Sequence, residues 1–223
     1  MSDKSIWDFW AKYYQGLWVQ KLSLEPTRSE IIDQLRLQIT DKDRQYRILD
    51  IGCGTGQLAR DIQMNFSDYD ISVAAIDYSD EMIKQAKKNQ KRYEKRSDAA
   101  TFININYFNM SAEDIDTLET DFDVIICTHS LPYYKDQRNV IMKMLSILSE
   151  DGMLYLAQAS ENNFYDRMIL KLVKLTTTKA YYPSIRRMKY MTADIADMMM
   201  IKKIRMKFFM PSIYIFVLEN RKK

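Results

Sequence analysis

Cysteine and histidine are almost absent from this chain of 223 residues, which has two cysteines and one histidine. The two thiols, Cys53 and Cys127, provide no disulfide framework, and together with His129 they lack the clustered spacing of zinc ligands. We therefore expect no metal site and, by default, a reducing, cytoplasmic compartment.

Long apolar runs are also lacking, since none approaches the roughly 20 residues that span a bilayer. The first residues mix aromatic and charged side chains (Trp7, Asp8, Trp10 and Lys12), where a signal peptide has an uninterrupted apolar region. There is no internal repeat, low-complexity tract or Gly/Ser linker. With 47% hydrophobic and 28% charged residues, the composition is typical of a soluble globular protein with one domain.

The net charge of +3 conceals an uneven distribution, because residues 160–223 hold 14 Lys and Arg against 5 Asp and Glu. A basic C-terminal third favours an acidic substrate or an anionic membrane surface, although solvated helix faces also explain it. The small overall charge and the lack of a recognisable RNA-binding module give no reason to expect a nucleic-acid partner.

Hydrophobic patterning between residues 46 and 158 predicts strands that alternate with helices. The predicted strands cover residues 46–51, 72–77, 101–108, 122–127 and 153–158, and the predicted helices cover residues 57–64, 80–93 and 137–149, with a turn at Asp151-Gly152. Two further helices are expected at residues 5–22 and 30–39. Such alternation indicates an α/β fold with a parallel sheet and helices on both faces.

The C-terminal region breaks this alternation. Two strand-like runs, at residues 202–209 and 212–219, are separated only by Met210 and Pro211. Because so short a link permits an antiparallel hairpin but no parallel crossover, we expect a mostly parallel sheet that ends in a hairpin.

The most specific motif is the run Asp50-Ile51-Gly52-Cys53-Gly54-Thr55-Gly56, between the first predicted strand and the next helix. Alternating glycines let the backbone turn tightly and approach a ligand closely. The loop lies at the carboxyl end of a strand, where open α/β sheets bind ligands. Gln57 stands where a dinucleotide fingerprint needs glycine or alanine, and the Gly-Lys-Ser/Thr of a phosphate loop is absent.

Asp77 ends the second predicted strand, 25 residues after Gly52. A carboxylate there is able to accept two hydrogen bonds from the adjacent hydroxyls of a ribose. A helix cap or a turn is the alternative role for a single acidic residue at a strand end. The glycine loop at this spacing favours the ribose.

These residues resemble the class I S-adenosylmethionine-dependent methyltransferases, particularly the small-molecule group typified by enzymes of ubiquinone and menaquinone biosynthesis. The resemblance covers about residues 46–159. It implies a Rossmann-like methyltransferase fold whose seven-stranded, mostly parallel sheet carries a C-terminal antiparallel hairpin. It also implies S-adenosylmethionine as cofactor and a small-molecule acceptor.

The resemblance carries over a set of cofactor-binding positions. They are Tyr14, Asp50, Gly52, Cys53, Gly54, Gly56, Asp77, Tyr78, Met82, Ser111, Ala112, Glu113 and Thr128. In the family, the position of Asp50 lies near the cofactor's amino group and that of Tyr14 reaches its carboxylate. Ser111 departs from the family pattern, which usually has an Asp that meets the adenine amino group.

The acceptor end is less specific. His129, which follows the fourth predicted strand, is the candidate general base, and shaping its loop is the alternative role. The candidate acceptor-binding residues are Trp10, Tyr13, Tyr133, Tyr134, Arg186 and Arg187. The N-terminal aromatics equally suit a helix face packed on the sheet. The run Leu131-Pro132-Tyr133-Tyr134 lacks the Asn/Asp and the second proline of amino-methylating nucleic-acid enzymes.

Residues 163–175 combine an apolar helix with a cationic stripe, which suits a substrate lid, a membrane surface, a partner subunit or a buried core helix. We expect one methyltransferase domain over residues 1–223, with a helical cap (1–40), a cofactor-binding core (46–159), a helical lid (160–200) and the hairpin (201–223). A non-catalytic cofactor-binding scaffold is the alternative function, and an RNA methyltransferase a weaker one. The acceptor and the oligomeric state stay open.

Overall fold

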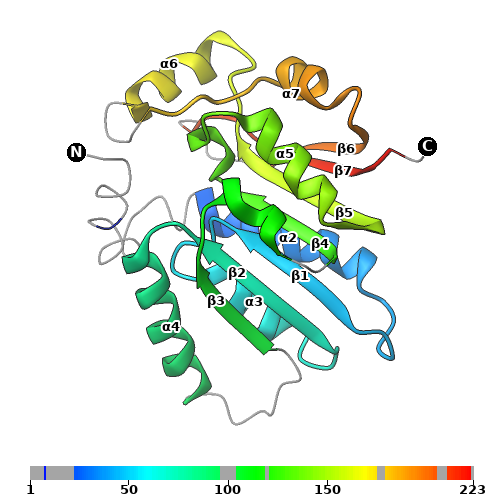
Figure 1. Ribbon diagram of the computed structural model, residues 1–223. Coiled ribbons are helices and arrows are strands. Elements are labelled where there is room, and N and C mark those ends of the chain that lie inside the picture. Colours follow the sequence, from blue (N-terminus) through cyan, green and yellow to red (C-terminus); the bar gives the residue numbers. More distant parts are fainter. Residues whose placement is uncertain are drawn as a thin grey trace.

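The computed structural model describes Asp8 and residues 23–95, 104–118, 121–174, 179–204 and 210–221. Its centre is a seven-stranded sheet in the order β3-β2-β1-β4-β5-β7-β6 (Figure 1). The strands are β1 (Tyr46–Ile51), β2 (Ile71–Asp77), β3 (Asn104–Asn109), β4 (Phe122–Thr128), β5 (Leu148–Ala159), β6 (Ala196–Ile204) and β7 (Ile213–Asn220). The first five pair in parallel, whereas β7 is antiparallel to both β5 and β6. The expected fold class is therefore confirmed.

Helices cover both faces of the sheet. They are α2 (Glu25–Gln38), α3 (Gln57–Asn65), α4 (Asp80–Glu94), α5 (Gln137–Ser146), α6 (Phe164–Lys174) and α7 (Ile185–Thr192), with 3-10 helices at Ala112–Thr117 and Leu131–Tyr133. Buried side chains of α2 and α3 pack in one core cluster, and those of α5 and α7 pack in the other. None of the described helices is long and apolar enough to cross a membrane.

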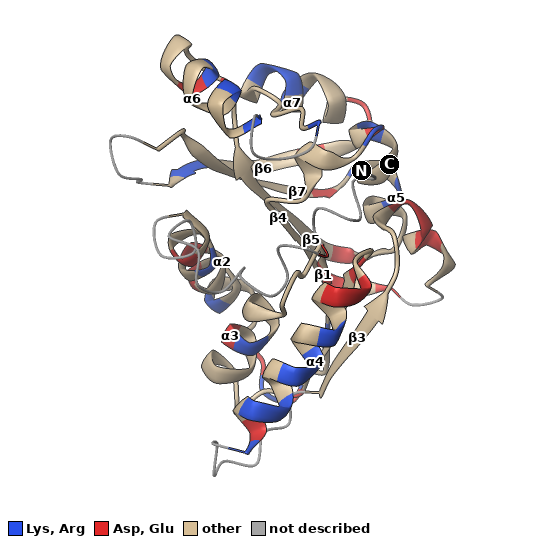
Figure 2. Ribbon diagram, turned by 90° about the vertical axis from the view of Figure 1, so that its left-hand side faces the viewer, with Lys and Arg blue, Asp and Glu red and all other residues tan. Residues whose placement is uncertain are grey.

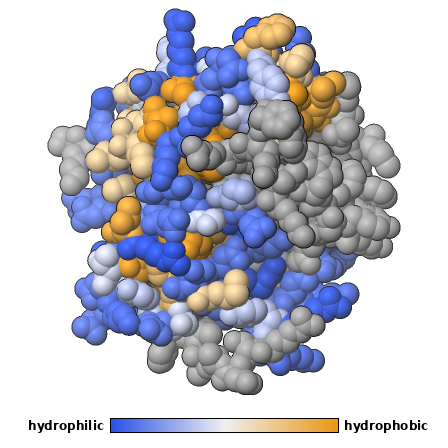
Figure 3. All heavy atoms as spheres, turned by 180° about the vertical axis from the view of Figure 1, so that it is seen from behind, coloured by the Kyte–Doolittle hydropathy of each residue, from blue (hydrophilic) through white to orange (hydrophobic). Residues whose placement is uncertain are grey.

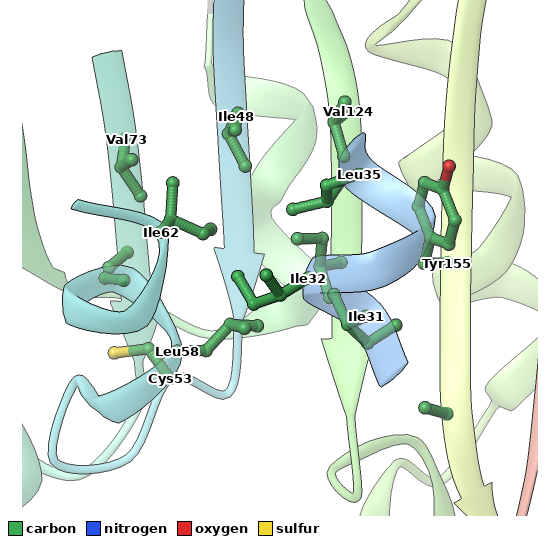
Figure 4. Close-up of a cluster of buried hydrophobic side chains, with 14 of the residues drawn as sticks. Ile31, Ile32, Leu35, Ile48, Cys53, Leu58, Ile62, Val73, Val124 and Tyr155 are labelled. Atoms are coloured by element: carbon green, nitrogen blue, oxygen red, sulfur yellow. The ribbon is translucent and has the colours of Figure 1, made fainter. Parts of the chain in front are cut away.

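The period of two in β1 explains these two cores. Tyr46 and Ile48 belong to the cluster under α2 and α3, whereas Leu49 and Ile51 belong to the cluster under α5 and α7. In the first cluster, α2 and α3 direct their side chains onto the strands (Figure 4). A strand that is apolar on both sides is buried on both faces, as a central parallel strand must be.

Two predicted boundaries near β5 are wrong. The helix predicted to reach residue 149 ends at Ser146, and β5 already begins at Leu148. The predicted turn at Asp151-Gly152 lies inside β5. There the pairing with β4 shifts from Phe122–Leu148 to Val124–Met153, so β5 has more residues than β4 between these two pairs. An irregularity within the strand accommodates the additional residues, and the chain does not reverse.

The C-terminal hairpin is confirmed, but its limits differ from those predicted. The strand expected over residues 202–209 is β6, which begins at Ala196, so the helical lid predicted to reach residue 200 ends earlier. Ile204 pairs with Ile213, and residues 205–209 of the predicted strand lie outside the described residues. Pairing with β7 decides this outcome, because the strand preference of a segment depends strongly on the strands beside it.

The sheet order also fixes where ligands bind. β1 lies between β2 and β4, so the chain leaves its carboxyl end at a point where the order of the strands reverses. Open α/β sheets bind ligands outside the carboxyl ends of their strands at such a switch point. The glycine loop, Asp77 and Thr128 all follow or end strands at this edge.

Candidate functional site

The glycine loop after β1 holds three glycines in a conformation that disfavours other residues. Gly52, Gly54 and Gly56 have φ angles of 72°, 54° and 73°. A Cβ atom on Gly52 would lie 2.4 Å from the Ser130 Cβ, and one on Gly56 would lie 2.6 Å from the Tyr107 hydroxyl oxygen. Both the backbone angles and the close neighbours therefore require glycine.

Asp77, at the end of β2, ties the loop to the helix that follows. Its Oδ2 accepts a hydrogen bond from the Gly54 amide at 2.9 Å, and its Oδ1 accepts one from the Ser79 amide at 2.9 Å. Burial raises the pKa of the Asp77 carboxyl, and these two amide hydrogen bonds oppose the rise. Because an ionised carboxylate has about four lone-pair sites, Asp77 retains the capacity to accept further hydrogen bonds.

A main cavity of about 280 Å³ opens at the carboxyl edge of the sheet. Its lining comprises Gly52 and Gly54, then Ile76, Asp77, Tyr78 and Met82, then Met110, Ser111, Ala112 and Glu113, and finally Thr128, His129, Ser130, Tyr133, Tyr134 and Lys135. Segments that follow four different strands therefore converge on one hollow. Most of the cofactor positions expected from the sequence, and both tyrosines expected at the acceptor end, line it.

A smaller cavity adjoins the first and shares Gly52, Gly54, Thr128 and His129 with it. Asp50, Cys53 and Arg28 also line this smaller cavity. Neither carboxylate oxygen of the buried Asp50 has a hydrogen-bond partner among the described residues. Burial raises the pKa of Asp50 to about 7, the charge of Asp77 adds to the rise, and Arg28 opposes it. An uncompensated buried carboxylate of this kind suits a ligand that brings a cation.

Arg28 places a guanidinium in the same small cavity. It projects from α2, and its Nε lies 2.7 Å from the Asp61 Oδ2 on α3. The cavity thus presents an acidic and a basic side chain together. That pairing complements a ligand that carries both an ammonium and a carboxylate group.

His129, which lies between the two cavities, has an unusual backbone and a defined tautomer. Its φ of 59° is the only positive φ among the described non-glycine residues. The Thr27 hydroxyl donates its proton to the Ser23 carbonyl at 2.8 Å and lies 3.1 Å from the His129 Nε2. A hydroxyl has one proton, so Nε2 is the donor in the second bond and Nδ1 is left as an acceptor. Burial, reinforced by Arg28, lowers the pKa of His129 to about 4, so the ring is neutral at pH 7.

The loop after β4 brings the two tyrosines to the main cavity. Burial raises the pKa of Tyr134 well above its usual value. The Tyr133 hydroxyl lies 3.5 Å from that of Tyr182, in the segment between α6 and α7. Lys135 extends the lining with an exposed cation. Both polar and charged groups are thus available at this end.

Other predicted residues lie elsewhere. Trp10, Tyr13 and Tyr14 fall outside the described residues. Arg186 and Arg187 are exposed on α7 and line neither cavity, so their role in acceptor binding stays a prediction. No group of three or more His, Cys, Asp or Glu side chains suited to a metal ion occurs in the described part of the chain.

Sequence reasoning missed Arg28, Met110, Ser130 and Lys135. The last three directly adjoin predicted positions in the loops after β3 and β4, and that adjacency was the available signal. Arg28 gives no such signal, because only the packing of α2 against α3 brings it to the smaller cavity.

The comparisons with known proteins agree with this geometry. Residues 48–152 match a protein family described as "Methyltransferase domain". The malonyl-[acyl-carrier protein] O-methyltransferase of Bacillus anthracis is 30% identical over 132 residues, which are 56% of this chain and 44% of that protein. The chain spans about half the length of the curated relatives it matches.

Solved structures show the same fold. Magnesium protoporphyrin IX methyltransferase (ChlM) from Synechocystis PCC 6803, with bound SAH, superposes with a TM-score of 0.64 at 18% identity, covering 92% of this chain and 88% of that one. The N-methyltransferase NodS from Bradyrhizobium japonicum WM9, in complex with S-adenosyl-l-homocysteine, gives a TM-score of 0.63 at 16% identity, covering 88% and 89%. The expected resemblance to class I methyltransferases and the expected fold are thereby confirmed.

Proposed function

We propose that this chain, which contains a methyltransferase domain with the class I fold, transfers a methyl group from S-adenosylmethionine to a small-molecule acceptor. The observation that carries this proposal is the glycine loop held against Asp77: the Gly54 amide donates a hydrogen bond to the carboxylate, and both residues line the main cavity. This arrangement leaves a carboxylate beside a backbone that a ligand can approach closely.

The residues present fit the cofactor at both of its polar ends. Asp50 and Arg28 would hold its ammonium and carboxylate groups, since the buried carboxylate has no partner of its own among the described residues. Asp77 would accept hydrogen bonds from the ribose hydroxyls. Tyr78 and Met82 would border the adenine, and Ser111, Ala112 and Glu113 from the loop after β3 complete that part of the cavity.

When bound, the cofactor supplies an electrophilic methyl group on a positively charged sulfur. The chain contributes alignment of the acceptor and exclusion of water, which together account for several kcal/mol of the barrier in such transfers. His129 would receive a hydrogen bond from the acceptor at Nδ1, the ring nitrogen that Thr27 leaves without a proton. His129 is neutral at pH 7 and is therefore able to accept that bond.

The acceptor would be a small molecule that carries an anionic group. Lys135 supports this proposal, because it places an exposed cation in the lining of the main cavity. Methyltransferases of malonyl-[acyl-carrier protein] and of magnesium protoporphyrin IX are among the similar proteins. Lys135→Gln should raise the KM for an acidic acceptor and leave the Kd for the cofactor unchanged.

We further propose that residues 5–22 and 161–190 close over the site; of residues 5–22, Asp8 alone is among the described residues. Asp8, the described residue of the N-terminal segment, accepts a hydrogen bond from the Ser79 hydroxyl at 2.5 Å, two residues from Asp77. The Tyr181 amide donates a hydrogen bond to the Pro132 carbonyl at 2.7 Å, which ties the segment after α6 to the loop of the two tyrosines.

We also propose a cytoplasmic location, which cell fractionation tests.

Isothermal titration calorimetry with S-adenosylmethionine tests cofactor binding. Asp77→Ala removes charge-assisted bonds and should raise the Kd on the order of 100-fold. Asp68→Ala is the matched control, because Asp68 is an exposed acid paired with Lys42. No binding by the wild-type chain, or equal losses in both variants, would contradict the proposal.

Turnover requires a separate measurement. Incubating the protein with a metabolite extract and cofactor labelled in its methyl group should yield a labelled small molecule. Cofactor binding without any transfer would instead favour a non-catalytic scaffold. Label in RNA would move the assignment to a nucleic-acid methyltransferase.

A further inference from the structure

Helix α6 presents a row of large apolar side chains on its outer face. Phe164, Met168 and Leu172 follow one another at intervals of four and so lie along one side of the helix. They are 80%, 47% and 59% exposed. The opposite side of α6 is buried through Asp166 and Leu170. The helix therefore packs on the protein through one face and exposes large apolar side chains to solvent on the other. A buried core helix would not expose these side chains.

Several contacts hold α6 in this orientation. The Asp166 carboxylate accepts a hydrogen bond from the Ser212 amide at 2.8 Å, which links the helix to the start of β7. The Asn163 side chain accepts one from the Asp166 amide at 2.8 Å. Lys174, in the last turn, pairs with Glu161 at 2.8 Å. The apolar row is thus presented by a helix that is fixed at both ends.

Cations border the apolar row. Arg167 and Lys171 are exposed on α6, and neither takes part in an ion pair with another described residue. The one acidic residue of the helix, Asp166, is buried. In Figure 2, the Lys and Arg residues of α6 lie beside those of α7 at one end of the molecule, where Arg186 and Arg187 add exposed positive charge. In Figure 3, hydrophobic residues gather at the upper right, where α6 lies in that view.

We propose that the α6 face, defined as Phe164, Arg167, Met168, Lys171 and Leu172, docks onto an anionic lipid membrane. An apolar row flanked by cations places its hydrophobic side chains at the boundary between headgroups and acyl chains and its cations among the phosphates. A second copy of the chain is a poor match, because it would bring the same uncompensated cations together. The proposal goes beyond methyl transfer and requires none of its chemistry.

Docking in this way would also orient the main cavity. α6 begins five residues after the carboxyl end of β5, at the same edge of the sheet as the glycine loop. Figure 1 shows α6 at the end of the molecule toward which the parallel strands point. Membrane contact through α6 would therefore hold this edge near the lipid surface.

Sedimentation with lipid vesicles tests the proposal on the full chain. We expect binding to vesicles of phosphatidylcholine with 30% phosphatidylglycerol, weaker binding as salt rises, and little binding to phosphatidylcholine alone. The double variant Arg167→Gln/Lys171→Gln should lower the partition coefficient by roughly 30-fold, the loss that corresponds to two cations at an anionic surface. Phe164→Ser/Leu172→Ser should lower it by about tenfold or more, because both apolar anchors are removed.

Two matched controls separate a specific surface from general attraction. Lys87→Gln/Lys88→Gln removes two exposed cations from the basic helix α4, and Leu37→Ser removes an exposed apolar residue from α2. Both control variants should bind like the wild type. The proposal is overturned if the wild type fails to bind anionic vesicles or if the α4 variant loses as much binding as the α6 variant. The proposal is also overturned if sedimentation velocity shows a wild-type dimer that Phe164→Ser/Leu172→Ser dissociates. The α6 face would then bind a second copy of the chain and not a membrane.

Discussion

Asp50→Asn gives the sharpest test of the smaller cavity, because it keeps the shape of the side chain and removes its charge. The pKa of Asp50 is raised to about 7, so the ionised fraction falls about tenfold between pH 8 and pH 6. If the carboxylate holds the cofactor's ammonium group, the wild-type Kd should rise by about the same factor over this range. The Kd of Asp50→Asn should show no such change and, at pH 8, should exceed that of the wild type by roughly tenfold or more.

Calorimetry at pH 6, 7 and 8 measures this effect. The cofactor's own amino group titrates near pH 8, and its deprotonation weakens the wild type most if Asp50 binds the ammonium form. The change in the ratio of the two Kd values between pH 6 and pH 7 is therefore the most informative quantity. In buffers of different ionisation enthalpy, the wild type should release about half a proton more than the variant on binding at pH 7. A ratio that stays constant from pH 6 to pH 8 would refute the role given to Asp50.

The same substitution should have the opposite effect on folding. The folded-state pKa of Asp50 lies above the unfolded value of 3.8, so the folded state binds the proton more tightly. Stability is therefore lost as the pH rises from 3.8 through 7, by about 4 kcal/mol for a shift of this size. Asp50→Asn should raise the free energy of unfolding at pH 8 and leave it nearly unchanged at pH 3.5, as measured by urea titration. Weaker binding together with greater stability excludes misfolding as the cause.

Three further outcomes are expected. Gly52→Ala should lower the free energy of unfolding by about 2 kcal/mol or more, because Gly52 has a φ of 72° and a Cβ there would clash with Ser130. Partial recovery of stability in Gly52→Ala/Ser130→Gly would show that the clash accounts for part of the loss. Thr27→Val should alter the ¹⁵N shifts of the His129 ring and slow turnover several-fold, whereas Thr27→Ser should preserve both. Identical spectra for the wild type and the two variants would contradict the assigned tautomer. Because the pKa of His129 falls to about 4, the folded state loses about 3 kcal/mol as the pH drops from 6.5 toward 4, and His129→Gln should abolish that part of the acid sensitivity.

The sequence alone determined those features that arise from neighbouring residues. The limits of β1 follow from a short apolar run closed by glycines, and they match the structure from Tyr46 to Ile51. The glycine loop was predictable because positive φ angles and close approach impose a local demand that glycine meets. Asp77 was predictable because it ends a strand at the edge where this loop lies.

Only the tertiary structure decided which distant groups meet. Thr27 and His129 are 102 residues apart, and their hydrogen bond, which sets the histidine tautomer, exists only because α2 packs over the end of β4. Arg28 reaches the smaller cavity from that same helix. Asp50 has a raised pKa because neighbouring segments bury it without supplying a partner among the described residues. Local sequence patterns encode backbone preference and burial, but the pairing and charge of a buried side chain depend on what the fold places around it, and that information lies elsewhere in the chain.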